Sequence, residues 1–334
     1  MPIIRLAHGP RHGNLNAPKY NFPMGQLAKV DLVGVGLNAT DTLISVAEFP
    51  ARGSKVEYNE ETIMPGGQVA SAVVACRLWG LTTRYVGKLG NDDAARLHER
   101  EFARTGVEAH LIHVPDVASP KSTILVDRHG ERTVLCRRDN RLILQPEELE
   151  REWIVNARVL HLDGHDTAAA TCAAEWARGA GVPVVADLDE LYPGVERLIE
   201  NVDYLIVSRD FPTRLMKEND LHSALSKMHL RFGCDLAAAT LGEEGVLAFN
   251  GKDFYHRTAF RVPVVDTTGA GDVFHAGFIF GLLQGWDLEH RLDFACAAAA
   301  INCTAEGARG CIQSVEAIEA MIKADCRYQV SSIS

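Results

Sequence analysis

The feature that most constrains the fold is a repeated alternation of short apolar runs and helical segments in the second half of the chain. Four runs between residues 159 and 242, VLHLDG, VPVVADLD, VDYLIVS and LAAATLG, are separated by stretches of helical composition. Parallel strands joined by crossover helices are buried on both faces, so their sequences are apolar runs rather than alternating ones. The pattern predicts a doubly wound α/β fold, in which a mostly parallel sheet carries helices on both faces.

The amino-terminal half predicts further elements of the same sheet and some that do not belong to it. Residues 29–38 form an apolar run typical of a buried strand, and residues 68–78 have helical composition. Strand-like segments at about 43–63 and 110–137 fall outside the strand–helix alternation, and the second contains a hairpin pattern. We expect these inserted strands to form a small β lid over the mouth of the main sheet.

Composition sets the domain organisation and excludes several classes of function. With 47% hydrophobic and 23% charged residues, the chain has enough apolar side chains for a packed core. Residues 29–334 are expected to form a single domain, and residues 1–28 an irregular amino-terminal extension. A net charge of −10 argues against nucleic-acid binding. The longest weakly polar run, residues 295–305, is too short to span a membrane.

Cysteine usage and the amino terminus indicate the compartment. The eight cysteines are scattered without a Cys-x-x-Cys pair, and no Cys/His grouping has the spacing of a metal cluster. The first 25 residues contain no apolar core of the kind found in signal peptides. We therefore expect reduced thiols and a cytoplasmic location.

One segment contains more small residues than a turn and a helix cap require. It reads VVDTTGAGDVFHAG from residue 264 to residue 277. Gly269, Ala270 and Gly271 would lie between a strand at residues 262–265 and a helix that starts near Asp272. Small residues let backbone N–H groups approach a ligand, and a helix amino terminus favours negative charge. The segment predicts an anion hole for a phosphate.

Asp272 would repel an anion bound beside it unless its carboxylate has a separate task. Phosphoryl transfer needs positioning, charge neutralisation and an acceptor for the proton of the attacking hydroxyl, and Asp272 is suited to that last role. The alternative is that Asp272 merely caps the helix, a role worth about 1 kcal/mol. This segment alone leaves both interpretations open.

The same residues resemble a known family. Asp266 to Asp272, followed by Ala276-Gly277-Phe278, resembles the carboxyl-terminal signature of the PfkB/ribokinase family of carbohydrate kinases. The resemblance extends over residues 30–322, and its nearest members are ketohexokinases and fructokinases. Four further segments resemble family motifs: residues 36–41, 65–71, 87–92 and 240–245.

The resemblance implies an ATP-dependent sugar kinase that transfers the γ-phosphoryl group to a carbohydrate hydroxyl. Asp272 would be the general base, and Gly269, Ala270 and Gly271 would form the anion hole. The sugar would be bound by Asp41, Gly66, Gly67, Gln68, Ser71 and Asp272. ATP would be bound by Thr240, Gly242, Glu243, Gly245, Thr268, Gly269, Gly271, Ala299, Asn302 and Cys303. Mg²⁺ would bridge the phosphates, and a monovalent cation such as K⁺ would lie near Asp266, Thr268 and Gly310.

Two positions depart from the family pattern. Ser71 stands where the amino-terminal signature usually has asparagine, so its polar contact to the sugar is shorter. The N-x-x-E motif associated with Mg²⁺ and phosphate is replaced at both ends, and the chain reads Ser208-Arg209-Asp210-Phe211. Ketohexokinase-like members also lack this motif, so activity is still expected. Either Asp210 or Glu243 would then approach Mg²⁺ through water.

Three other functions share features with this sequence. A nucleoside kinase has the same fold and chemistry, and a non-catalytic sugar or nucleotide sensor would need no base. Gly34, Gly36 and Ala39 also satisfy the dinucleotide-binding pattern G-x-G-x-x-A, but the segment after them is strand-like where that pattern needs a helix. The expected partner is a small-molecule sugar, and we expect a homodimer through the lid strands.

Overall fold

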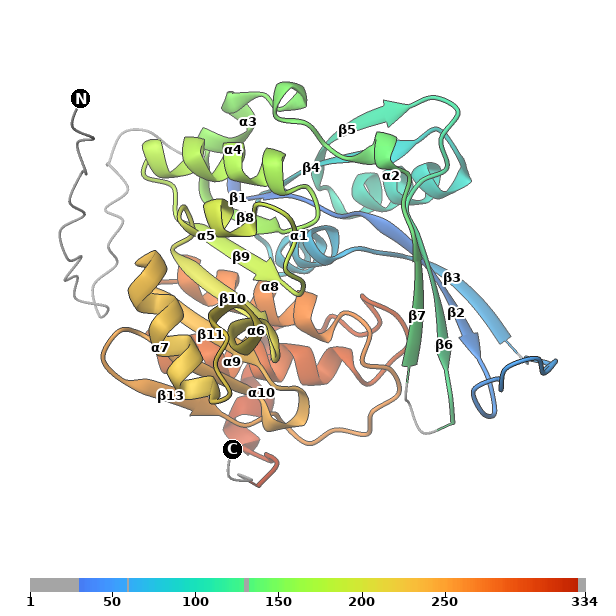
Figure 1. Ribbon diagram of the computed structural model, residues 1–334. Coiled ribbons are helices and arrows are strands. Elements are labelled where there is room, and N and C mark those ends of the chain that lie inside the picture. Colours follow the sequence, from blue (N-terminus) through green and yellow to red (C-terminus); the bar gives the residue numbers. More distant parts are fainter. Residues whose placement is uncertain (1–29, 59, 129–131, 330–334) are drawn as a thin grey trace.

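A large and a small sheet organise the chain, as seen in the computed structural model, which describes residues 30–58, 60–128 and 132–329 (Figure 1). The predicted extension, residues 1–28, lies outside the described residues. The main sheet has the strand order β13-β12-β11-β10-β9-β8-β1-β4-β5. Its strands are β1 (Val30–Val35), β4 (Thr83–Gly90), β5 (Glu108–Val114), β8 (Ala157–Asp163), β9 (Val184–Leu188), β10 (Tyr204–Ser208), β11 (Leu236–Thr240), β12 (Val246–Phe249) and β13 (Phe254–Arg257).

The sheet is parallel from β5 to β11, and each of its faces is buried. In β10, Tyr204 and Ile206 belong to one apolar core, whereas Leu205 and Val207 belong to the other. Successive side chains of a strand point to opposite faces, so this apolar run places residues in both cores. The prediction of a doubly wound sheet with helices on both faces is confirmed.

Two layers of helices cover the main sheet (Figure 1). One core is shared with α1 (Gln68–Leu78), α2 (Asp93–Thr105), α8 (Ala270–Leu283), α9 (Leu288–Asn302) and α10 (Val315–Ala324). The other is shared with α3 (Arg151–Val155), α4 (Thr167–Gly179), α5 (Val195–Ile199), α6 (Phe211–Met216) and α7 (Leu221–Phe232). No helix among the described residues is long and apolar enough to cross a membrane.

The small sheet has the order β3-β2-β6-β7 and stands off one side of the helical body (Figure 1). Its strands are β2 (Ala39–Ser45), β3 (Glu60–Gly66), β6 (Lys121–Val126) and β7 (Arg132–Arg137). The expected lid segment 110–137 therefore needs a correction, because β5 pairs in parallel with β4 at the edge of the main sheet. An edge strand is solvated on one side, which explains why its sequence EAHLIHV is half polar.

One further local prediction was wrong, and one hairpin was not predicted. Residues 262–265 form no strand, and Val264 and Val265 are about half exposed, at 49% and 46%. Pro263 lacks the N–H that a ladder requires, which disfavours a strand there. The antiparallel hairpin of β12 and β13 was not foreseen. Helix α8 begins at Ala270, close to the expected start near Asp272.

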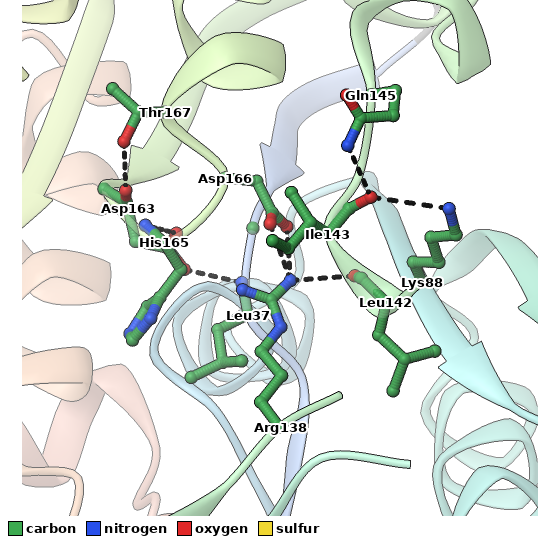
Figure 2. Close-up of polar contacts among 12 residues, drawn as sticks. Leu37, Lys88, Arg138, Leu142, Ile143, Gln145, Asp163, His165, Asp166 and Thr167 are labelled. Atoms are coloured by element: carbon green, nitrogen blue, oxygen red, sulfur yellow. Dashed lines mark hydrogen bonds and ion pairs between the residues drawn. The ribbon is translucent and has the colours of Figure 1, made fainter. Parts of the chain in front are cut away.

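Polar contacts fix the places where the chain passes between the two sheets (Figure 2). Leu37, between β1 and β2, donates its N–H to Oδ2 of Asp163 at 2.6 Å. Arg138, directly after β7, donates from Nη2 to both carboxylate oxygens of Asp166, at 2.6 and 2.7 Å. The same Nη2 is 3.0 Å from the carbonyl oxygen of Leu142. These contacts anchor the base of the small sheet to the ends of β1 and β8.

The two-core arrangement predicts unequal effects of the same substitution at two leucines. Leu205 in β10 is fully buried, whereas Leu230 in α7 is 84% exposed. Leu205→Ala should lower the free energy of unfolding by about 2–5 kcal/mol, because it leaves a cavity in the core. Leu230→Ala should change it by less than about 0.5 kcal/mol. Urea unfolding followed by circular dichroism measures both, and equal losses would contradict the arrangement.

Candidate functional site

A cavity of about 790 Å³ lies between the main sheet and the small sheet. Residues at or just after the carboxyl ends of the parallel strands line one wall: Leu37, His165, Asp187, Asp189, Ser208 and Thr240. The small sheet contributes Asp41, Ser122, Ile124, Arg132, Val134 and Cys136. Ligands of doubly wound folds bind outside the carboxyl ends of the strands, so this position marks the candidate site.

The first turn of α8 forms part of the cavity wall, through Gly269, Ala270, Gly271 and Asp272. Gly269 is the N-cap, with φ of 74°, and a Cβ there would lie 2.2 Å from the carbonyl oxygen of Ala308. A Cβ at Gly271 would meet no atom within 4 Å, so that position is open. No side chain caps this helix. The cap interpretation of Asp272 was therefore wrong, and the amino terminus of α8 keeps its N–H groups for a ligand.

Asp272 is half-buried and lies near two other carboxyls, those of Asp187 and Asp41. Burial and the neighbouring carboxyl of Asp187 raise the pKa of Asp272 to about 8, and Asp41 adds to the increase. His275 and a hydrogen bond from Ser71 act in the opposite direction. A carboxyl with its pKa near the physiological range is suited to accept a proton during a reaction.

Asp187 and His275 lie in the cavity wall next to this carboxyl. The ring Nδ1 of His275 is 2.8 Å from the carbonyl oxygen of Gly271 and 3.4 Å from Oδ2 of Asp187. Its Nε2 is 3.3 Å from the carbonyl oxygen of Ile206. Burial lowers the pKa of His275, and burial together with Asp189 raises the pKa of Asp187 well above its usual range. His275 thus ties the first turn of α8 to the end of β9.

On the small-sheet side of the cavity, Asp41 projects from β2 and is 5% exposed. Burial raises its pKa to about 6, against the hydrogen bond from Ser122 and the charge of Arg309. A Cβ on Gly66 would lie 1.9 Å from Oδ2 of Asp41, so the carboxylate needs a glycine there. Gly67, with φ of 96°, approaches the carbonyl oxygen of Leu37, which a Cβ would meet at 2.6 Å.

The predicted sugar residues divide into those that line the cavity and those behind its wall. Asp41, Gly67 and Gln68 line it, whereas Gly66 and Ser71 do not. Arg309 holds the latter two, donating from Nη2 to the carbonyl oxygen of Gly66 at 3.0 Å and from Nε to Oγ of Ser71 at 3.2 Å. This arginine also forms an ion pair with Glu101.

The residues predicted to bind ATP lie mostly along the remaining wall. The cavity is lined there by Thr240, Gly242, Glu243, Gly245, Thr268, Ala299 and Cys303. Asn302 is an exception, because it is fully buried and does not reach the cavity. Its amide donates to the carbonyl oxygens of Thr268 and Ala308, each at 3.3 Å, and accepts from the N–H of Cys311 at 3.2 Å. Asn302 thus holds the loops of the site together.

Asp266 performs a similar task beside the turn that contains Gly269 and Gly271. Its Oδ1 accepts from the N–H and hydroxyl of Thr268, at 2.9 and 2.7 Å, and its Oδ2 from the N–H of Gly307 at 2.8 Å. Asp266 and Gly310 lie outside the cavity lining. Within residues 30–329, leaving aside the masked positions, no group of three or more His, Cys, Asp or Glu side chains has the geometry of a metal site.

Sequence reasoning missed several residues of the cavity. Asp187 and Asp189 stand at and just after the end of β9, and the rule that ligands meet strand ends would have found them. Arg132, Val134 and Cys136 alternate along β7 and all line the cavity. The period of two along a strand was the signal for this face. His165, which follows the end of β8, also lines the cavity.

Comparisons with known proteins agree with this arrangement. The profile described as pfkB family carbohydrate kinase matches residues 28–315. An ATP-dependent ribose-1-phosphate kinase of Halopiger xanaduensis is 28% identical over 274 residues, which cover 80% of this chain and 90% of that protein. A 5-dehydro-2-deoxygluconokinase of Bacillus subtilis is 28% identical over 336 residues, covering 92% and 99%.

The crystal structure of ribokinase from Thermotoga maritima has the same fold. It superposes with a TM-score of 0.77 at 26% identity, covering 88% of this chain and 99% of that one. The family profile spans both sheets and the first turn of α8, including Asp272. The chain therefore belongs to the PfkB family of carbohydrate kinases.

Proposed function

We propose that the protein transfers the γ-phosphoryl group of ATP to a hydroxyl of a small sugar, with Asp272 as the general base. The observation that carries this proposal is the position of Asp272 in the first turn of an uncapped helix, on the wall of a cavity that extends to Asp41. An anion-binding helix terminus and a proton acceptor are thereby combined in one turn. A pure sensor has no need of such a base.

The acceptor hydroxyl is placed between the small sheet and α8. Asp41, with Gly67 and Gln68, holds the sugar, and Ser71 supports this wall from behind through Arg309. Asp272 accepts the proton of the attacking hydroxyl as the bond to the γ-phosphorus forms and the bond to the leaving oxygen breaks. The small sheet acts as a lid that excludes water competing for the phosphoryl group.

The nucleotide is placed along the loops after β11 and over the open wall at Ala299 and Cys303. Its phosphates lie at the amino terminus of α8, where the N–H groups of Gly269, Ala270 and Gly271 stabilise negative charge. Arg132 supplies a further positive charge, since its Nη1 is 3.3 Å from Oγ1 of Thr268 beside this turn.

Cations complete the proposal. Mg²⁺ would neutralise phosphate charge, and Glu243, which lines the cavity while Asp210 does not, would be the residue to hold it through water. A monovalent cation such as K⁺ is proposed at the turn that Asp266, Thr268 and Gly310 flank. Assays should therefore contain both Mg²⁺ and K⁺.

Asp272→Asn should lower turnover by at least ~100-fold, because the variant removes the general base and keeps the shape of the side chain. The measurement is ADP release with ATP, Mg²⁺ and K⁺ across ketoses, aldoses, sugar acids and nucleosides. Asp253→Asn is the control, since Asp253 lies in the turn between β12 and β13, outside the cavity lining. An Asp272→Asn variant as active as the parent would refute the base assignment.

The raised pKa of Asp272, about 8, predicts how kcat/KM depends on pH. A base must be deprotonated, so kcat/KM should fall about tenfold per pH unit below ~8 and level off above it. Asp187→Asn should move this limb to lower pH, because a second carboxyl close by opposes ionisation of the first. A limb that stays in place would show that Asp187 does not act on the base.

The same pKa predicts a stability effect that needs no substrate. The folded-state pKa of Asp272 lies above its ordinary value of 3.8, so the folded protein binds this proton more tightly than the unfolded chain. The contribution to stability is therefore present at low pH and lost as pH rises from about 4 to about 8. Asp272→Asn should gain thermal stability relative to the parent at pH 8.5 but not at pH 4. An equal shift in Tm at both pH values would contradict this.

A further inference from the structure

We infer that the acceptor is an uncharged polyhydroxyl molecule, a neutral sugar or glycoside, and that sugar phosphates and sugar acids are discriminated against. This inference rests on the proposed function and specifies its substrate class. The names of two relatives, a ribose-1-phosphate kinase and a 5-dehydro-2-deoxygluconokinase, indicate acceptors that carry a phosphate or a carboxylate. The residues that line the cavity of this chain instead favour an uncharged acceptor.

The acceptor end of the cavity is rich in carboxyl groups. Asp41 comes from the small sheet, Asp187 and Asp189 from the end of β9, and Asp272 from α8. An anionic group on the acceptor would be placed among these side chains. Like charges brought together in a partly desolvated site cost binding free energy, and this is a common way to exclude a wrong partner.

These carboxyl groups raise one another's pKa, which reduces the negative charge that the cluster carries at neutral pH. Asp272 and Asp187 both have raised pKa values, to which neighbouring carboxyls contribute. An additional anion would raise the pKa of Asp272 further and keep the base protonated at neutral pH. An anionic acceptor would thus be disfavoured twice, in binding and in the proton transfer.

Two arginines near this end form ion pairs with carboxylates outside the cavity lining. Nη2 of Arg138 contacts both oxygens of Asp166, whose side chain is only 4% exposed, and Arg138 does not line the cavity (Figure 2). Arg309 is paired with Glu101 and also lies outside the lining. In the part of the chain that the structure describes, Arg132 is the only arginine or lysine that lines the cavity. Its Nη1 contacts Oγ1 of Thr268 beside the first turn of α8, and its charge also lowers the pKa of Asp41.

Hydroxyl groups of an acceptor, in contrast, would meet hydrogen-bonding side chains at this end of the cavity. The phenol oxygen of Tyr192 donates to Oδ1 of Asp189 at 3.2 Å and is 3.2 and 3.3 Å from the ring nitrogens of His165. Asp189 and His165 both line the cavity, so Tyr192 holds an acceptor and an imidazole side by side in its wall. Carboxylates accept strong hydrogen bonds from hydroxyls, and Asp41 offers the same group from the opposite sheet.

The test compares kcat/KM within matched pairs of acceptors: ribose with ribose 1-phosphate, fructose with fructose 6-phosphate, and glucitol with gluconate. The neutral member should be preferred by at least ~100-fold in the pair that contains the best acceptor. Asp189→Asn removes one negative charge and keeps an oxygen that accepts from Tyr192. It should raise the ratio of anionic to neutral kcat/KM about tenfold, whereas Asp253→Asn, with the same change in net charge, should leave the ratio unchanged.

The outcomes separate the two proposals. Turnover that favours the anionic member would overturn the substrate class and leave the kinase assignment intact. If Arg132→Gln then abolished that preference, the acceptor's anion would be assigned to Arg132. A ratio that responds equally to Asp189→Asn and Asp253→Asn would also overturn the role of the acceptor-end carboxyls. Absence of turnover with every acceptor, in the pairs and in the wider panel, would overturn the proposed function itself.

Discussion

The site depends on one constraint of parallel sheets, which is that all strands end at the same edge. Asp163 at the end of β8, Asp187 at the end of β9 and Thr240 at the end of β11 are brought to this edge from distant parts of the sequence. Helices that follow such strands begin there, and their amino termini favour negative charge. Helix α8 adds its uncapped amino terminus to the same cavity. The fold thus brings a helix amino terminus without a side-chain cap and several carboxyl groups to one edge of the sheet.

Burial explains the behaviour of these carboxyl groups better than any single contact does. Asp41, Asp187 and Asp272 each have a raised pKa, and desolvation is the largest cause for all three. Ion pairs with arginine are instead found just outside the cavity, at Arg138 with Asp166 and at Arg309 with Glu101. Carboxylates that are ion-paired with arginine thus lie in the supporting wall, whereas the three carboxyls with raised pKa values line the cavity.

Most strands and helices of the main sheet could be predicted from the sequence, and each element that was missed has a local physical reason. Strands β8 to β11 and the helix at Gln68–Leu78 were predicted because elements that are buried have strongly apolar sequences. Strand β5 was assigned to the lid because an edge strand and a lid strand have similar half-polar sequences. The expected strand at residues 262–265 overlooked Pro263, whose missing N–H removes a ladder bond.

In the candidate site, too, some residues could be predicted from the sequence and others could not. Gly269, Gly271 and Asp272 stand in a compact motif, so their proximity follows from the sequence itself. Asp189 and Arg132 join the site only through sheet pairing and strand direction, which single residues do not reveal. Asn302 illustrates the converse, since its place beside a motif suggested a ligand contact while its three hydrogen bonds serve the loops.

The pairing of β2 with β6 has a consequence for the order of folding. Between these two strands the chain forms β3 and α1 and then the strand–helix–strand unit of β4, α2 and β5. The loop that brings them together must close over that whole unit, and contacts of such long sequence separation form slowly. Helix α8 lies later still, near the carboxyl-terminal end of the matched region. A chain emerging from the ribosome would therefore hold a nearly complete main sheet before α8 and α9 are available to complete the wall of the cavity.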